Sequence, residues 1–331
     1  MKILYGVQGT GNGHISRSKE IIERLNRFAQ VDTLISGSLH EMDPGLEVKY
    51  RKDGTGAWFK KNGGLDYWGF MRKTKFIKMI KDILSIPVKR YDLVVSDFEP
   101  LTAWSAKYYG VPSVHLSHQI ALLDNHIPRP PQKDMLAELV IKHFAPCGRQ
   151  IGLHYQRYSE NVLTPIIRSE VRNLAVSNLG HFVVYFSTYD PLKVGRFLNG
   201  ADAKFELFSK YYSFNSPTTK YNVTVYPFKK ELFLRRLSSC SGIICNAGFQ
   251  LTSEALLLGK RMLVIPMRGQ YEQLCNAEAL KQLGVTVVTG IDDGFGDRLR
   301  MWLERRTKAQ KIDYPDNAAE VVSKILGCLH S

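Results

Sequence analysis

A glycine-rich turn that ends in a histidine is the first place in the sequence where chemistry is expected. Residues 8–14 have the sequence Gln-Gly-Thr-Gly-Asn-Gly-His and stand between an expected strand and an expected helix. Glycines let a ligand approach the backbone closely, so Gly11, Asn12 and Gly13 are candidates for a binding loop. His14 begins the helix, whose positive end disfavours a charged ring, so we expect a neutral imidazole that can accept a proton. The alternative is a turn in which the histidine only caps or packs.

Two carboxylates, Asp97 and Glu99, follow an apolar run that is typical of a strand buried on both faces. A carboxylate at this position could accept a hydrogen bond from His14, which would fix the tautomer of the ring and stabilise the cation formed on proton transfer. The other expected role is to cap the helix that starts near residue 101. The sequence predicts both roles and leaves open which carboxylate has which.

Polar residues also follow two successive strands in the second half of the chain. Residues 246–254 run from a strand into a helix, and the free amides and positive end of such a helix favour a phosphate. Glu254, about one turn into that helix, is placed to bind both hydroxyls of a ribose. Glu272 and Gln273 follow the next strand, and their side chains suit the hydroxyls of a sugar. The alternative for each position alone is a solvated helix start.

The elements that must position these residues are short apolar runs that alternate with helical patterns in both halves of the chain. This rhythm predicts parallel sheets covered by helices. The expected strands span residues 2–8, 31–36, 91–96, 112–117, 181–187, 204–208, 222–226, 241–245, 261–266 and 285–289. The expected helices start near residues 14 and 316 and otherwise span residues 101–109, 229–237, 250–258 and 272–283.

The pattern restarts after about residue 176, which predicts two domains. We expect an N-terminal domain over residues 1–165 and a C-terminal domain over residues 176–311. In the final segment, residues 312–331, an amphipathic helix is expected to pack back toward the N-terminal domain. The expected fold class is α/β, with two Rossmann-like, doubly wound parallel sheets. Ligands of such sheets bind beyond the carboxyl ends of the strands, so the two domains should face each other across a cleft.

The composition excludes several classes of protein. The chain has 331 residues, of which 44% are hydrophobic and 23% are charged, so it is not a disordered chain, a collagen or a disulfide-stapled miniprotein. Its five cysteines form no Cys-x-x-Cys pair, so no zinc or disulfide framework is expected and a reducing cytoplasm fits. No apolar run resembles a signal peptide or reaches the roughly 18 residues of a membrane span. The formal net charge of +14 favours an anionic partner.

Taken in order, these motifs resemble those of GT-B glycosyltransferases, in the branch that contains the lipid II-forming N-acetylglucosaminyltransferase and the UDP-glycosyltransferases. The resemblance covers nearly the whole chain and rests on residues 11–14, 96–97, 246–254, 272–273 and 276–277. It implies the GT-B fold, in which two Rossmann-like domains face a cleft.

The resemblance also implies roles for single residues. His14 is expected to be the general base and Asp97 to orient it, with Glu99 as the other candidate. The helix start at residues 248–250 is expected to hold the pyrophosphate, and residues 226–228 to lie near the nucleobase. The residues expected to bind the nucleotide sugar are Tyr226, Phe228, Asn246, Gly248, Phe249, Gln250, Glu254, Glu272 and Gln273. No Asp-x-Asp motif for a metal ion is present.

The predicted function is that of an inverting, metal-independent glycosyltransferase. It would move a sugar from a nucleotide sugar, UDP-linked by resemblance, to an acceptor hydroxyl on a lipid or a cell-envelope glycan, with no other cofactor. One alternative is a non-hydrolysing nucleotide-sugar 2-epimerase, which would need acid and base groups on both sides of the sugar ring. The second alternative, from charge alone, is a nucleic-acid-binding protein, but the sequence has no motif of the known modules and no nucleic acid is expected.

A basic segment with interleaved aromatic residues stands in the first half. Residues 49–90 hold twelve Lys and Arg against three acids. In a helix from about residue 75, Lys75, Lys78 and Lys81 fall on one side and apolar residues on the other. Residues 57–84 are therefore expected to lie on an anionic membrane surface, with the protein cytoplasmic and peripheral on the inner face of the membrane. The alternative is that the apolar side packs on the sheet and the lysines are solvated.

Overall fold

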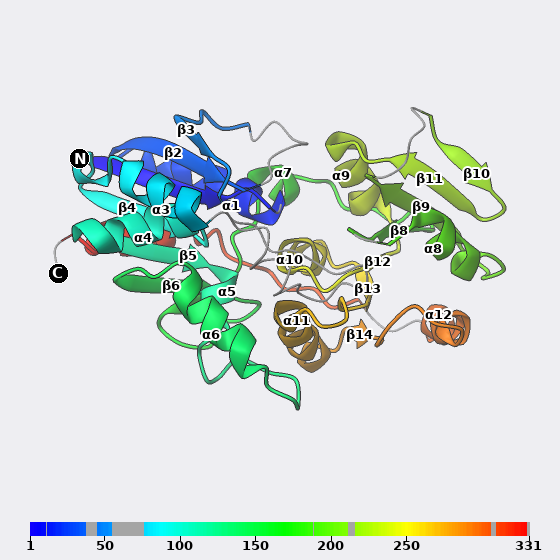
Figure 1. Ribbon diagram of the computed structural model, residues 1–331. Coiled ribbons are helices and arrows are strands. Elements are labelled where there is room, and N and C mark those ends of the chain that lie inside the picture. Colours follow the sequence, from blue (N-terminus) through cyan, green and yellow to red (C-terminus); the bar gives the residue numbers. More distant parts are fainter. Residues whose placement is uncertain are drawn as a thin grey trace.

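Two parallel sheets, one in each half of the chain, form the frame of the computed structural model (Figure 1). The structure describes residues 1–10, 12–37, 45–54, 76–187, 189–210, 216–305 and 309–329. In this part of the chain each sheet has seven strands, and helices cover its faces. The predicted fold class, α/β with two doubly wound sheets, is confirmed.

The N-terminal sheet consists of β1 (Lys2–Gln8), β2 (Gln30–Ser36), β3 (Tyr50–Lys52), β4 (Leu93–Asp97), β5 (Ser113–Ser117), β6 (Arg149–Leu153) and β7 (Val162–Leu163). Its order is β3-β2-β1-β4-β5-β6-β7, and every neighbouring pair is parallel. The central strand β4 is buried along its whole length. The register pairs Val7 of β1 with Asp97 of β4, so both strands end at the same edge of the sheet.

The helices of this domain are α1 (Asn12–Leu25), α3 (Phe76–Ser85), the 3-10 helix η1 (Val88–Arg90), α4 (Pro100–Tyr109), α5 (His118–Ala121), α6 (Met135–Phe144) and α7 (Ser169–Arg172). Successive side chains of a strand point to opposite faces of the sheet, so they pack against different helices. Ile3 and Tyr5 of β1 pack on the side of α1, whereas Leu4 packs on the side of α3 and α4. Helix α4 begins after its N-cap, Glu99, and ends at Gly110, whose φ of 68° suits glycine.

The C-terminal sheet consists of β8 (His181–Tyr185), β9 (Lys204–Ser209), β10 (Thr218–Lys220), β11 (Val223–Pro227), β12 (Gly242–Cys245), β13 (Arg261–Val264) and β14 (Thr286–Val287). Its order is β10-β11-β9-β8-β12-β13-β14, and only the β10–β11 pair is antiparallel in the described part of the chain. Its helices are α8 (Pro191–Leu198), α9 (Lys230–Ser239), α10 (Phe249–Leu257), α11 (Tyr271–Gln282) and α12 (Phe295–Glu304). Val184 packs on the side of α8 and α12, and Val183 on the side of α9 and α10.

The two domains touch where the carboxyl ends of their strands meet. A single apolar cluster runs through both, and in it the ring centroids of Tyr155 and Phe249 lie 5.2 Å apart. After the C-terminal domain the chain crosses back, and α13 (Ala318–Gly327) packs beside α1 (Figure 1). An ion pair between Arg24 and Asp316 closes this contact.

The sequence prediction matches these elements closely along the chain. Each predicted strand and helix occurs, and its ends differ from the prediction by two residues at most. The strands β3, β6, β7 and β10 and the helices α5, α6, α7, α8 and α12 are additional. Among the described residues, no helix combines the length and the low polarity that crossing a bilayer requires.

Candidate active site

His14 and Asp97 form a hydrogen-bonded pair at the carboxyl edge of the N-terminal sheet. His14 lies in the first turn of α1, and its Nδ1 lies 2.8 Å from Oδ1 of Asp97, the last residue of β4. Because an ionised carboxylate only accepts hydrogen bonds, Nδ1 carries the proton of the neutral ring. This leaves the lone pair on Nε2, and the side chain is 11% exposed, so Nε2 can take a proton from a ligand.

Side chains of its own domain keep Asp97 ionised. Asp97 is fully buried, and Arg17 donates from Nε to its Oδ2 at 3.0 Å and from Nη2 to its Oδ1. Ser18 donates from Oγ to Oδ2 at 3.1 Å. Burial alone would raise the pKa of Asp97, but the charges of Arg17 and His14 hold that pKa well below its usual range. Asp97 can therefore stabilise the imidazolium that proton transfer creates on His14.

Glu99 has a structural role instead. Its two oxygens accept four hydrogen bonds, at 2.6 to 2.9 Å, from the first turn of α4 and from the hydroxyl of Ser36. Between the two carboxylates, Phe98 has a φ of 53°, which is rare for a bulky residue. This turn of the backbone lets Asp97 and Glu99 face different partners. The prediction that kept Glu99 as a catalytic candidate beside His14 is therefore wrong, since Glu99 caps α4.

The amino ends of α1 and α10 face each other. A β-carbon at Gly13 would lie 3.3 Å from Cβ of Gln250, so the glycine permits a closer approach than alanine would. Helix α10 begins after Gly248, which offers no side chain to cap the first turn, so the amides there suit phosphate oxygens. Gly11 and the side chain of Asn12 lie outside the described residues.

Glu254 is occupied by an arginine from the segment between the two sheets. Arg168 donates from Nε to Oε1 at 2.7 Å and from Nη2 to Oε2 at 2.6 Å. Gln250 also donates to Oε1, at 2.9 Å, and Glu254 is 1% exposed. A ribose can therefore reach this carboxylate only if the guanidinium of Arg168 moves away.

Of the predicted sugar-binding pair, Glu272 contacts the N-terminal domain. Its Oε1 lies 2.7 Å from Nε2 of His118, and its Oε2 accepts from Nε2 of Gln119 at 3.1 Å. Burial would raise the pKa of Glu272, but His118 and Gln119 lower it, so the carboxylate stays ionised. Gln273 accepts on its Oε1 from the amide of Met267 at 2.9 Å, which supports the turn before α11. Its contact with a sugar hydroxyl stays a prediction.

The residues expected near the nucleobase pack on the C-terminal sheet. The ring of Tyr226 stacks on Phe208 with centroids 5.1 Å apart, and Phe228 belongs to the same aromatic cluster. Asn246 donates from Nδ2 to the carbonyl of Ile265 at 2.9 Å, which ties the end of β12 to the end of β13. Tyr226 and Phe228 are half-buried, and their contact with a base stays a prediction.

The structure brings in residues that the sequence analysis did not single out, namely Arg17, His118, Gln119 and Arg168. The ring of His118 lies flat on Phe249 of α10, with centroids 4.8 Å apart and planes 8° apart. Gln119 places its Nε2 3.3 Å from Nε2 of His14. His118 and Gln119 directly follow the carboxyl end of β5. Because ligands of parallel sheets bind beyond these ends, the argument that singled out Asp97 also applies to them. Arg168 gives no such signal.

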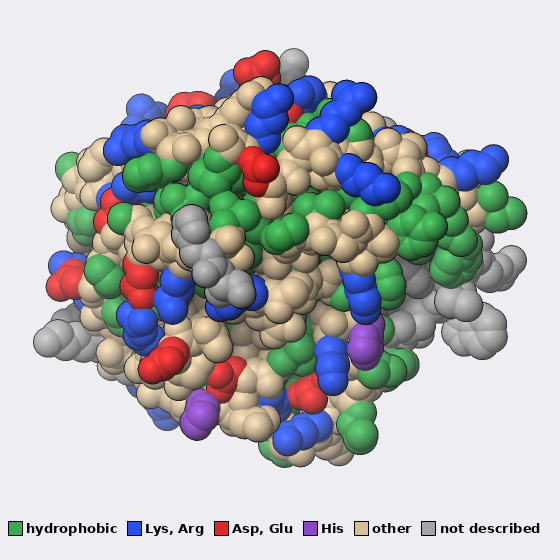
Figure 2. Space-filling model, turned by 90° about the vertical axis from the view of Figure 1, so that its left-hand side faces the viewer, with side chains coloured by type: hydrophobic (Ala, Val, Ile, Leu, Met, Phe, Trp, Pro, Cys, Tyr) green, Lys and Arg blue, Asp and Glu red, His purple; other side chains and the backbone are tan. Residues whose placement is uncertain are grey.

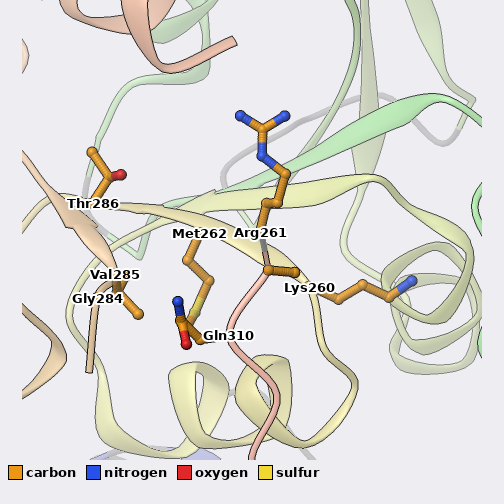
Figure 3. A pocket seen from close by; sticks show the side chains of 8 residues that line it. Lys260, Arg261, Met262, Gly284, Val285, Thr286 and Gln310 are labelled. Atoms are coloured by element: carbon orange, nitrogen blue, oxygen red, sulfur yellow. The ribbon is translucent and has the colours of Figure 1, made fainter. Parts of the chain in front are cut away.

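A cavity lies at the opposite, amino end of β13 (Figure 3). Its two cations have partners elsewhere. Nζ of Lys260 donates to three carbonyl oxygens, and the guanidinium of Arg261 lies 4.8 Å from the centroid of the Trp302 ring. In Figure 3 both side chains extend away from Gln310. Since parallel sheets bind ligands at their carboxyl ends, this cavity is not the candidate active site. Elsewhere in the described part of the chain, no three His, Cys, Asp or Glu side chains group as metal ligands would.

The sequence and the fold are similar to those of known proteins. The family model described as glycosyl transferase family 1 matches residues 1–305. No curated protein matches the sequence at a significant level. Similar solved structures include MurG of Acinetobacter baumannii (16% identity, TM-score 0.60, 98% of this chain and 99% of that chain). A second is UGT89C1 of Arabidopsis thaliana in complex with UDP (13% identity, TM-score 0.61, 98% of this chain and 99% of that chain). A third is the spinosyn forosaminyltransferase SpnP (16% identity, TM-score 0.60, 99% of this chain and 95% of that chain).

At these identities the solved structures show the fold, which is GT-B, and no more. The family model covers most of the chain and carries the activity. The chain is therefore a glycosyltransferase and belongs to glycosyl transferase family 1.

Proposed function

We propose that the protein transfers a sugar from a UDP-linked donor to an acceptor hydroxyl with inversion at the anomeric carbon. The observation that carries this proposal is the placement of His14. Its Nε2 lies next to Gln119, which in turn binds Glu272 of the other domain. A proton acceptor from one domain therefore faces the side of the other domain that suits a sugar and a phosphate.

The proposed reaction needs only groups that the chain supplies. The acceptor hydroxyl gives its proton to Nε2 of His14 while its oxygen attacks the anomeric carbon. The bond from that carbon to the diphosphate breaks on the opposite face, which inverts the configuration. Asp97 stabilises the imidazolium. The amides and the positive end of α10 receive the departing diphosphate in place of a metal ion, and no cofactor other than the nucleotide sugar takes part.

The ribose is proposed to bind Glu254 after exchange with Arg168. Charge-assisted hydrogen bonds to a ribose contribute roughly 1.5–3 kcal/mol each at most, so Glu254→Gln should weaken UDP binding by about tenfold or more. Titration calorimetry with UDP measures this effect, with Glu304→Gln at the exposed end of α12 as the control. An unchanged affinity would mean that the pair of Glu254 and Arg168 is structural.

The acceptor is proposed to be a lipid-linked or cell-envelope glycan presented at an anionic membrane. The support is the set of exposed apolar side chains on α3, α4 and α6, which hydrogen bonds join to one another. Tyr109 of α4 donates to the carbonyl of Leu84 in α3 at 3.1 Å, and Trp104 donates to the carbonyl of Phe144 in α6 at 3.2 Å. The exposed apolar side chains of these three helices are Phe76, Ile77, Ile80, Leu84, Trp104, Tyr108, Met135, Leu136, Leu139 and Val140.

Exposed lysines stand on the same three helices. They are Lys78, Lys81, Lys107 and Lys142. Figure 2 shows a band of hydrophobic side chains, with Lys and Arg nearby, on the side of the molecule that lies at the left in Figure 1. In helix α3, Met79 and Ile83 pack against the core, whereas the side chain of Ile77 is 74% exposed. Residues 55–75, which hold every aromatic residue of the predicted membrane segment except Phe76, lie outside the described residues.

Sedimentation with vesicles tests the membrane proposal. At low salt the protein should sediment with anionic vesicles and remain in solution with neutral ones, because each basic residue near anionic headgroups contributes about 1 kcal/mol. High salt should release it. A protein that stays in solution with anionic vesicles at low salt would exclude a membrane-bound acceptor. The proposed location, on the inner face of the cytoplasmic membrane, depends on the same result.

A panel of UDP-sugars, with and without candidate acceptors, tests the activity. We expect UDP release and a product of inverted anomeric configuration by NMR, with no loss of rate in EDTA. A product of retained configuration would overturn the assignment of His14 as the base of an inverting reaction. An epimer of the donor formed without acceptor would favour the nucleotide-sugar 2-epimerase.

A further inference from the structure

The turn after β5 places Gln119 between the functional groups of the two domains. Gln119 is the second residue of α5 and is 6% exposed. Its Nε2 lies 3.3 Å from Nε2 of His14 and donates to Oε2 of Glu272 at 3.1 Å. Because neutral His14 carries its proton on Nδ1, one N–H of Gln119 is directed at the lone pair that would accept the proton of the acceptor.

The other end of the same amide is unsatisfied. Oε1 of Gln119 is buried and has no hydrogen-bond partner among the described residues. A buried acceptor without a partner is unfavourable, and folded proteins keep few of them. A hydroxyl group would supply the missing hydrogen bond, and hydroxyl groups are what a glycosyltransferase site binds.

We propose that Gln119 contacts the substrates and covers the catalytic base until the acceptor arrives, an inference that rests on the proposed glycosyl transfer. The acceptor hydroxyl replaces the amide of Gln119 at Nε2 of His14. Oε1 of Gln119 then accepts a hydrogen bond from a sugar hydroxyl. Without acceptor, the amide keeps water away from His14.

The side reaction that this cover suppresses is hydrolysis of the donor. In that reaction the oxygen of water bonds to the anomeric carbon, and His14 takes one proton of the water. The bond from the anomeric carbon to the diphosphate breaks, and its electron pair stays on the leaving group. Exclusion of water from a site is a general way in which enzymes avoid such losses.

His118 lies against the carboxylate that Gln119 binds. Nε2 of His118 lies 2.7 Å from Oε1 of Glu272, and the ring rests on Phe249 of α10. Adjacent residues of the N-terminal domain thus contact both oxygens of one carboxylate of the C-terminal domain. This arrangement sets the distance between Gln119 and the donor side of the site.

The test measures UDP release from the UDP-sugar panel in the absence of acceptor. Gln119→Ala should raise this hydrolysis by about tenfold over the wild type, because water then reaches His14. Gln119→Asn keeps an amide that is one carbon shorter and should fall between the two. Gln282→Ala, at the exposed end of α11, is the control and should match the wild type.

Hydrolysis by Gln119→Ala at or below the wild-type rate, in a protein that melts normally and binds UDP, would overturn the inference. A residue with a structural role alone would lower this rate rather than raise it. If Gln119→Ala does not fold, Gln119→Asn decides by the same comparison. A wild-type protein that neither binds UDP nor releases it from any UDP-sugar would overturn the proposed function, and this inference with it. If the wild type is active and Gln119→Ala hydrolyses the donor at the same rate, the inference alone is overturned.

Discussion

The carboxylates on the two sides of the domain junction differ in where their partners come from. Asp97 is bound by three side chains of α1, so its site is complete within the N-terminal domain. The main partner of Glu254 is Arg168, and the partners of Glu272 are residues 118–119, all outside the C-terminal domain. Gln250, a second donor to Glu254, comes from the same helix. The proposed base is therefore independent of contact between the domains, whereas the donor-side carboxylates depend on it.

This difference separates two kinds of effect. A substitution at the base should change the chemistry or the stability of one domain. A substitution at a donor-side partner should change how the two domains hold together.

The largest effect is expected from Asp97→Asn. Removing one partner of a buried ion pair leaves Arg17 as an uncompensated buried charge, which costs about 3–5 kcal/mol of unfolding free energy. Since the pKa of Asp97 is lowered by folding, this stabilisation is present above the ordinary pKa of about 3.9 and is lost as the pH falls toward the folded value. Urea unfolding between about pH 7 and pH 3 should show a difference from wild type that shrinks below about pH 4.

The control for this experiment is Asp313→Asn, because Asp313 is 83% exposed in its pair with Lys311. Its unfolding free energy should stay within about 0.5 kcal/mol of the wild type. A difference between Asp97→Asn and wild type that does not change with pH would contradict an ionised, internally paired Asp97.

The next largest effect is expected from Arg168→Met. The substitution leaves the carboxylate of Glu254 buried without its main partner, which should cost about 3 kcal/mol. The double variant Arg168→Met with Glu254→Gln should recover part of this loss. Arg157→Met breaks an exposed ion pair with Glu320 and should cost about 1 kcal/mol or less.

Chemical denaturation of the four proteins measures these differences. If Arg168→Met is no less stable than Arg157→Met, the donor side does not depend on the segment between the domains. The contrast between the two sides of the junction would then fail at Glu254.

The same contrast decides how much of the site could be predicted from the sequence. His14 and Asp97 each stand near the carboxyl end of a strand, and these two strands end at the same edge of the sheet. The local sequence pattern is therefore enough to predict both residues. The choice between Asp97 and Glu99 depends on the positive φ of Phe98, which the residue type does not predict. The hydrogen bond from Arg168 to Glu254 joins residues far apart in the sequence, and no local pattern indicates it.

Successive residues of an α-helix point about 100° apart, so Glu272 and Gln273 have different protein partners, His118 with Gln119 for the one and the amide of Met267 for the other. The sequence analysis did not predict the strands β3 and β10. Both lie at sheet edges, where Arg51 of β3 and all of β10 are exposed, so they lack the apolar runs by which central strands are predicted.

A smaller effect in free energy, although a large one in rate, is expected from His14→Ala. Loss of a general base should lower kcat by about 100-fold or more, which is close to 2.7 kcal/mol in the activation barrier. Melting temperature and UDP affinity should stay near those of the wild type, because the base belongs to one domain. His126→Ala, whose side chain is 73% exposed, is the control and should keep full activity. A near-wild-type kcat for His14→Ala would show that His14 is not the general base.

The smallest effect is expected where the two sides meet, at Gly13. Replacing a helical glycine by alanine ordinarily stabilises a protein by about 0.5–1 kcal/mol. At Gly13 the new β-carbon would lie 3.3 Å from Cβ of Gln250, so the gain should be cancelled and kcat should fall by about two- to threefold as α1 and α10 move apart. Gly195→Ala in α8 meets nothing within 4 Å and should show the full gain in melting temperature with unchanged activity. Equal gains and unchanged rates in both variants would mean that a base complete in its own domain can work without close contact to the donor side.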